Sequence, residues 1–96
     1  MKVLSALQEH VIGDVIQERI RQEEKWGEQN HDPFIYLTIL MEEVGETAQA
    51  ALETRFGGKH GGLENLRQEA IQTAAVAMAI VECLDRNKWH WPEEER

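Results

Sequence analysis

Two short patterns in the sequence have the composition and spacing of a metal-binding site. EEVGE places Glu43 three residues before Glu46, and EAIQ places Glu69 three residues before Gln72. Residues three apart on a helix lie on one face, about 60° from each other. Each pair would therefore point in one direction from its own helix.

The residues around both pairs indicate partial burial. The arc of the helix that carries Glu43 and Glu46 also carries Tyr36, Ile39 and Ala50. Unit charges about 4.5 Å apart repel by roughly 3–4 kcal/mol at an effective dielectric near 20. If the two acidic pairs face each other, a cation must lie between them.

The donor types favour one kind of ion. Carboxylate and amide oxygens suit a hard cation such as Mg²⁺, which also accepts phosphate oxygens. A di-iron bundle needs Glu-x-x-His on two helices, and neither pair has His at the fourth position. Zinc is disfavoured because no His or Cys lies near either pair in the sequence.

The helix expected before the acidic patterns runs from Val3 to about Lys25. Its apolar residues recur at three- and four-residue spacing, which predicts a one-sided amphipathic helix. Glu18 and Arg19 fall among its polar residues. Trp26 and the following glycine are expected to end this helix.

Two further helices carry the acidic pairs. Asp32 is expected to cap the second helix, which runs from Pro33 to Phe56 and ends at a glycine. GGKHGG, at residues 57–62, is predicted to be a mobile loop, and the third helix runs from Leu63 to about Arg86. The predicted core face of the second helix consists of Leu37, Met41, Val44, Ala48, Ala51 and Leu52.

The third helix contains a run, residues 73–81, that is apolar all round. Two other helices from a 96-residue chain can hardly cover every side of it. We therefore expect an all-α, antiparallel bundle of about three main helices, completed by oligomerisation into a homodimer or tetramer with this helix at its centre. The tail, residues 88–96, is expected to pack its tryptophans on a neighbouring subunit or to form a lid over the site.

Composition limits the function classes. The length predicts a single domain spanning residues 1–96, and the net charge of −8 argues against a nucleic-acid polymer or an anionic membrane as partner. The single cysteine, Cys83, is predicted to be a small core residue. No secretory signal or long uncharged stretch is evident, so a cytoplasmic protein is expected.

The two patterns together resemble a known family. Glu-Glu-x-x-Glu at residues 42–46, followed after 22 residues by Glu-x-x-Gln at residues 69–72, is similar to the motifs of the MazG-like, all-α nucleoside triphosphate pyrophosphohydrolases. The resemblance extends over roughly Lys25 to Arg86. The family motif has Asp where this chain has Gln72, whose neutral amide would bind a metal ion more weakly.

The resemblance implies an oligomeric helical bundle that uses Mg²⁺, or Mn²⁺ as a substitute, to hydrolyse a nucleoside triphosphate between its α and β phosphorus atoms. The implied metal ligands are Glu43, Glu46, Glu69 and Gln72. Glu42 is implied to orient the attacking water, and either Glu42 or Glu46 would act as the base. Mg²⁺ would neutralise charge on the phosphates, and a polarised water would attack phosphorus.

The nucleotide needs further contacts. The segment around Trp26 and His31 resembles the family's base-binding region, with Phe34 or Tyr36 stacking behind it. Candidate cations for the outer phosphates are Lys25, Lys59, Arg67, Arg86 and Lys88.

Two alternatives to the enzyme remain open at the level of sequence. The first is a regulatory module that binds nucleotide and Mg²⁺ but turns over slowly because of Gln72. The second is a purely structural helical dimer whose acids face solvent.

Overall fold

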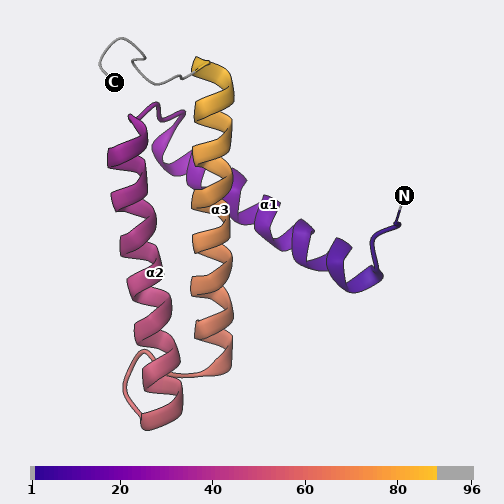
Figure 1. Cartoon of the computed structure of the whole chain (residues 1–96). Helices are drawn as coiled ribbons and strands as arrows, with labels where there is room; N and C mark the ends of the chain where they lie inside the picture. The colour runs from indigo at the N-terminus through magenta and orange to yellow at the C-terminus, as the bar shows by residue number, and fades with distance from the viewer. Residues whose placement is uncertain (1, 89–96) are drawn as a thin grey trace.

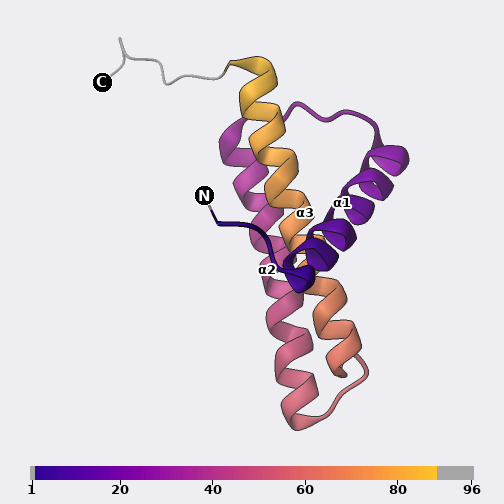
Figure 2. The same cartoon turned by 90° about the vertical axis from the view of Figure 1, so that its right-hand side faces the viewer.

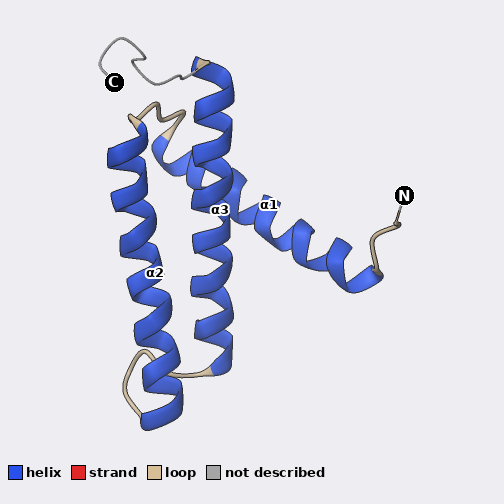
Figure 3. Cartoon of the chain, viewed as in Figure 1, coloured by secondary structure: helices blue, strands red, loops and turns tan. Residues whose placement is uncertain are grey.

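The computed structural model describes residues 2–88, which form helices joined by loops without any strand (Figures 1 and 3). The helices are α1 (Ala6–Trp26), α2 (Pro33–Phe56) and α3 (Leu63–Asn87). The predicted all-α architecture of three main helices is confirmed. The predictions for the tail fall on residues 89–96, which lie outside the described part of the chain.

The start of α1 lies later than the apolar pattern predicts. The Ser5 side chain accepts a hydrogen bond from the Gln8 backbone N–H, and the Gln8 side chain accepts one from the Ser5 N–H. This reciprocal capping satisfies two N–H groups that have no partner inside the helix, so the helix begins at Ala6. It ends at Gly27, whose φ of 74° is unfavourable for other residues.

The second and third helices form an antiparallel hairpin (Figures 1 and 2). As predicted, Asp32 caps α2 by accepting hydrogen bonds from the N–H groups of Phe34 and Ile35. The loop between α2 and α3 has its own hydrogen bonds: the His60 N–H donates to Glu53, and the Gly62 N–H donates to Thr54. These contacts tie the glycine-rich segment to the last turn of α2.

The first helix crosses α3 at an angle, and its N-terminal part extends away from the hairpin (Figures 1 and 2). The face of α1 that packs is polar: Arg19 and Gln22 are each 8% exposed, whereas Ile20 is 52% exposed. Arg19 donates two hydrogen bonds to Glu82 on α3, at 2.9 and 3.2 Å. The predicted apolar packing face of α1 is therefore wrong, because the buried polar groups find partners on α3.

The predicted core face of α2 is also wrong. Leu37, Met41, Val44 and Leu52 are between 38 and 60% exposed, and Ala48 and Ala51 are exposed as well. The buried residues of α2 are Tyr36 and Ala50, which lie on the arc that carries Glu43. The second helix has apolar residues on two sides, and α3 packs against the side that bears the acids.

The third helix forms the centre of the described chain, with α1 and α2 both packed against it. Its buried residues are small: Ala75, Val76, Ala79 and Cys83. Cys83 is therefore a core residue, as predicted. None of the helices in residues 2–88 combines the length and apolar character that a membrane span requires.

Candidate metal centre

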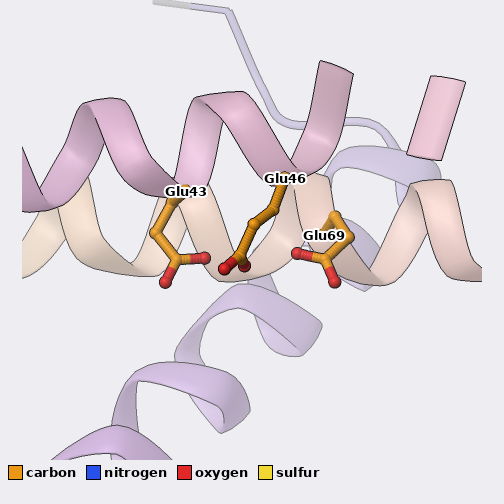
Figure 4. Close-up of side chains that lie close together, drawn as sticks. All are labelled: Glu43, Glu46 and Glu69. Atoms are coloured by element: carbon orange, nitrogen blue, oxygen red, sulfur yellow. The ribbon is translucent and has the colours of Figure 1, made fainter. Parts of the chain in front are cut away.

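Three carboxylates converge on one side of the α2–α3 hairpin (Figure 4). Glu43 and Glu46 project from one face of α2, and Glu69 projects from α3. One carboxylate oxygen from each residue lies within 4.8 Å of those from the other two. Because the helices are antiparallel, Glu46 and Glu69, which lie 23 positions apart in the sequence, become neighbours here.

Two of these carboxylates have an oxygen without a partner. Glu43 and Glu69 are half-buried, and the Oε2 atom of each is shielded from solvent without a hydrogen bond from any described residue. A shielded charged oxygen that lacks a donor is unfavourable, so such atoms are rare unless a cation or a proton satisfies them. The arrangement therefore has room for positive charge.

The electrostatics agree with this conclusion. Burial raises the pKa of Glu43, and the negative charges of Glu46, Glu69, Glu18 and Glu42 raise it further. Burial also raises the pKa of Glu69, and the adjacent Glu46 carboxylate adds to the effect. Each of these carboxyl groups is thus harder to ionise in the metal-free fold, and a cation would reverse that effect.

The nearby arginines do not neutralise the cluster. Arg19 pairs with Glu82 at 2.9 Å, Arg21 with Glu18 at 2.6 Å, and Arg86 with Glu28 at 3.3 Å. Among residues 2–88, no ion pair joins Glu43, Glu46 or Glu69 to a Lys, Arg or His side chain. A structural salt-bridge network therefore does not account for the three acids.

The donor set fits a hard divalent cation. Three carboxylates supply oxygen ligands only, and Mg²⁺ prefers oxygen ligands while keeping coordination positions open for water and phosphate. The two oxygens without a hydrogen-bond partner are compatible with a bound cation or with a proton.

The remaining predicted residues of the centre lie close by. Gln72 is half-buried one turn after Glu69, and its backbone carbonyl accepts a hydrogen bond from the Gln22 side chain at 3.4 Å. Its assignment as a fourth ligand stays a prediction. Glu42 is exposed and does not belong to the three-carboxylate group, although its charge contributes to the raised pKa of Glu43.

A cavity of about 220 Å³ opens beside Glu43. Trp26, a predicted base contact, and Tyr36, predicted to stack behind it, both line this cavity, together with Glu43 itself. Trp26 is half exposed, and Tyr36 is buried. The structure thus brings two aromatic side chains and a candidate metal ligand to the same hollow.

No protein family, characterised protein or solved structure matches the chain.

The other predicted substrate contacts are placed differently. His31 packs edge-on against the Tyr36 ring, with centroids 5.0 Å apart, and lines a neighbouring hollow of about 210 Å³ with Cys83. Phe34 is largely exposed at the start of α2. Of Phe34 and Tyr36, it is therefore Tyr36 that lines the cavity beside Glu43, with His31 packed against it.

Two of the five predicted phosphate contacts, Lys59 and Arg67, lie on the surface. Lys59 is exposed in the loop between α2 and α3. Arg67 pairs with Asp14 of α1 at 2.7 Å and lines an open hollow of about 1020 Å³ between α1 and α3. Among the described residues, the lining of that hollow does not include the three clustered carboxylates.

Three polar residues of α1 that the sequence pattern did not single out also contribute to the site. Arg19 and Gln22 line the cavity beside Glu43, and the charge of Glu18 raises the Glu43 pKa. Glu18 is largely buried and hydrogen-bonded to Arg21 and Gln22. The available signal was spacing: Arg19, Gln22 and Trp26 fall on one helical face at intervals of three and four residues.

Proposed function

We propose that this protein is a Mg²⁺-dependent pyrophosphohydrolase that cleaves a nucleoside or deoxynucleoside triphosphate into the monophosphate and pyrophosphate. The observation that carries the proposal is the group of three carboxylates with two shielded, unpartnered oxygens. Its support is the aromatic cavity that shares Glu43 with this group. The similarity of both acidic patterns to the MazG-like motifs favours the same reaction.

Glu43, Glu46 and Glu69 are the residues that would hold the ion, with Gln72 as a fourth ligand. A bound Mg²⁺ supplies charge neutralisation for the phosphate oxygens and lowers the pKa of a coordinated water. The three carboxylates also fix where the triphosphate can bind, because without the ion their charge would repel it. These residues would therefore promote the reaction by positioning the triphosphate and by stabilising the charge on its phosphates.

Glu46 is the better of the two candidates for the base. It belongs to the carboxylate cluster and is exposed, whereas Glu43 and Glu69 are half-buried. A solvent-facing carboxylate next to the ion can accept a proton from the attacking water and release it to bulk solvent. Glu42 lies outside the cluster, so its role would be limited to the effect of its negative charge on the neighbouring carboxylates.

The cavity beside Glu43 would take the nucleoside part of the substrate. The Trp26 ring offers a flat apolar surface, and the side chains of Arg19 and Gln22 offer hydrogen-bond donors to a base or sugar. Arg19 is already oriented by its two bonds to Glu82, so it would present the same geometry to each substrate.

We further propose that the enzyme works in the cytoplasm. Its only cysteine, Cys83, is a buried free thiol, which fits a reducing compartment. The net charge of −8 is compatible with a small anionic substrate, because Mg²⁺ would neutralise the charge of the triphosphate and no basic surface would be needed to attract it.

The test is release of pyrophosphate and a nucleoside monophosphate from a panel of triphosphates, with the full chain and Mg²⁺. We expect product from the parent and a loss of at least 100-fold in kcat/KM, about 2.7 kcal/mol, in Glu43→Gln and Glu69→Gln. Glu64→Gln, which removes an exposed acid from the first turn of α3, is the matched control and keeps the parent's rate.

Two other results would change the assignment. Stabilisation of the parent by Mg²⁺ and nucleotide together, without product, would indicate a nucleotide-binding regulatory module instead of an enzyme. A chain that responds to neither ligand and is unaffected by both glutamine substitutions would be a structural helical protein.

A further inference from the structure

The connection between α1 and α2, residues 27–32, has few backbone hydrogen bonds to define its conformation. At its start the Gly27 N–H donates to the Glu23 carbonyl, and at its end Asp32 caps α2. Between these points, no backbone–backbone hydrogen bond joins residues 28–31 to any described residue. The conformation of this segment therefore depends on contacts with side chains.

Those side chains come from the last two turns of α3, which lie beside the connection (Figure 1). Cys83, Arg86 and Asn87 are spaced three and four residues from the first, so they share one face of the helix. Arg86 donates to the Gln29 backbone carbonyl at 3.1 Å, and the Cys83 thiol donates to the His31 carbonyl at 3.5 Å. Two backbone groups of the connection thus have their partners on α3.

The side chain of Asn30 is the centre of these contacts. Its Oδ1 atom accepts hydrogen bonds from Arg86 Nε at 3.0 Å, from Arg86 Nη2 at 2.9 Å and from Asn87 Nδ2 at 2.8 Å. Its Nδ2 atom donates to Glu28 at 3.1 Å, and the same Glu28 oxygen lies 3.3 Å from Arg86 Nε. Hydrogen bonds from a charged guanidinium are stronger than those between neutral groups. Glu28, Asn30, Arg86 and Asn87 are called the Asn30 cluster below.

The Asn30 cluster adjoins the wall of the cavity beside Glu43. On the side of the connection, that wall consists of Trp26, Gly27 and Gln29. Asn30 follows directly in the chain and lines the neighbouring hollow. A single peptide bond therefore links a residue that lines the cavity to the residue that α3 holds, so a displacement of Asn30 would also move Gln29.

We propose that Arg86 and Asn87 are positioning residues for this cavity: by holding Asn30 and the Gln29 carbonyl, they fix the wall before a ligand binds. The identity of the ligand as a nucleotide rests on the proposed function, whereas the order of the wall does not. A wall that is already ordered saves the entropy that its ordering would cost on binding. The end of α3 thus sets the affinity for the nucleoside and not the rate of the chemical step.

This role differs from the phosphate contact that the sequence suggests for Arg86. Nε and Nη2 of its guanidinium already donate to the connection. Asn30→Ala separates the two roles, because it removes the acceptor and leaves the guanidinium in place. A positioning role predicts that Asn30→Ala and Arg86→Gln have the same effect, whereas a phosphate contact predicts an effect of Arg86→Gln alone.

The first test measures the order of the wall in the ligand-free full chain by ¹⁵N relaxation. We expect backbone order parameters of about 0.85 at residues 27, 28, 29 and 31 in the parent, and values below about 0.6 in Asn30→Ala and Arg86→Gln. Arg55→Gln, which removes an exposed arginine from the last turn of α2, is the control and keeps the parent's values. A flexible connection in the parent, or unchanged order parameters in both variants, would overturn the proposal.

The second test uses the triphosphate that the parent turns over fastest and, as an inhibitor, the monophosphate formed from it. Both Asn30→Ala and Arg86→Gln should raise the KM and the inhibition constant about 10-fold, with kcat unchanged. The double variant should resemble either single one, because both substitutions remove the same contact. A higher KM in Arg86→Gln alone, or additive effects in the double variant, would contradict the positioning role. A parent without turnover would count against the proposed function only, since the relaxation experiment decides whether the wall is held.

Discussion

The hydroxyl oxygens of Thr47 and Thr73 lie 3.0 Å apart and join α2 to α3 directly beside the three carboxylates. Thr47 follows Glu46 in the chain, and Thr73 lies one turn after Glu69. Each hydroxyl is also within hydrogen-bond distance of its own helix, at the backbone carbonyls of Glu43 and Glu69. This contact fixes the register of the two helices that bring the carboxylates together.

Thr73→Val should therefore weaken the site without removing a candidate ligand. We expect the free energy of unfolding to fall by about 1 kcal/mol, the usual net value of one hydrogen bond. Mg²⁺ affinity should fall as well, because the helices lose a contact that holds Glu69 opposite Glu46. Urea denaturation and metal titration measure the two effects. Thr73→Ser retains the hydroxyl and should behave like the parent; equal damage from both substitutions would indicate a packing role.

The aromatic wall of the cavity yields a prediction about substrate affinity. Trp26→Ala should raise KM for the triphosphate about 5- to 30-fold, since losing a stacking surface removes on the order of 1–2 kcal/mol. Mg²⁺ binding in the absence of nucleotide should not change. Phe56→Ala, at an exposed aromatic residue in the last turn of α2, is the control. A KM unaffected in Trp26→Ala would place the nucleoside elsewhere.

The raised pKa values of Glu43 and Glu69 predict how the metal-free stability depends on pH. A carboxyl group with a higher pKa in the folded chain binds more protons when folded. The stability that such a group contributes is fully present when the pH is below its pKa in the unfolded chain, near 4.5. This stability is lost as the pH rises through the higher pKa that the group has in the folded chain. The metal-free parent should therefore lose stability, through these two groups, above that pH.

A double variant isolates this contribution from the other carboxylates, some of which, such as Glu53, have lowered pKa values. The free energy of unfolding of Glu43→Gln/Glu69→Gln, minus that of the parent, should increase as the pH rises from 4 to 8 in the presence of a chelator. Saturating Mg²⁺ should stabilise the parent most at the upper end of this range, where the carboxylates are ionised. A difference that stays constant with pH would show that the two groups titrate normally.

Gln72 is tested by restoring an acid at this position. Gln72→Asp should bind Mg²⁺ more tightly than the parent, because a charged oxygen replaces a neutral amide oxygen as ligand. Calorimetric titration gives both affinities, and Gln68→Asp on an exposed position of the same helix controls for added negative charge. Equal or weaker binding by Gln72→Asp would show that residue 72 is not a ligand.

The helix boundaries were largely accessible from sequence because local signals set them. Asp32, Pro33 and Gly57 define the ends of α2 through capping and backbone preference, independently of the rest of the chain. The start of α1 was misplaced because hydrophobic spacing alone ignores the reciprocal cap between Ser5 and Gln8.

The faces on which the helices pack could not be predicted in the same way. The second helix has one apolar arc around Val44 and another around Tyr36, and periodicity does not say which one meets α3. The first helix buries Arg19 because Glu82, 63 residues away, receives its guanidinium. Such partners exist only in the folded chain, so the sequence pattern could not show that this polar face is the one that packs on α3.

The acidic cluster was predictable in part. Spacing placed Glu43 beside Glu46, and the expectation that a second acidic helix faces them is met by Glu69. The contribution of Glu18 and Gln22 from α1 was hidden, because it depends on how α1 crosses the hairpin. Sequence spacing shows which side chains share one face of a single helix. The angle at which two helices cross depends on how both of them pack, and spacing within one helix does not reveal it.

The most direct test of the metal centre is calorimetric titration of Mg²⁺ into the chelator-treated parent at pH 8, beside Glu43→Gln, Glu69→Gln and the control Glu64→Gln. We expect saturable binding by the parent and by Glu64→Gln, and its loss in the two variants that remove a clustered carboxylate. Absence of binding by the parent, or equal binding by all four proteins, would contradict the proposed metal centre.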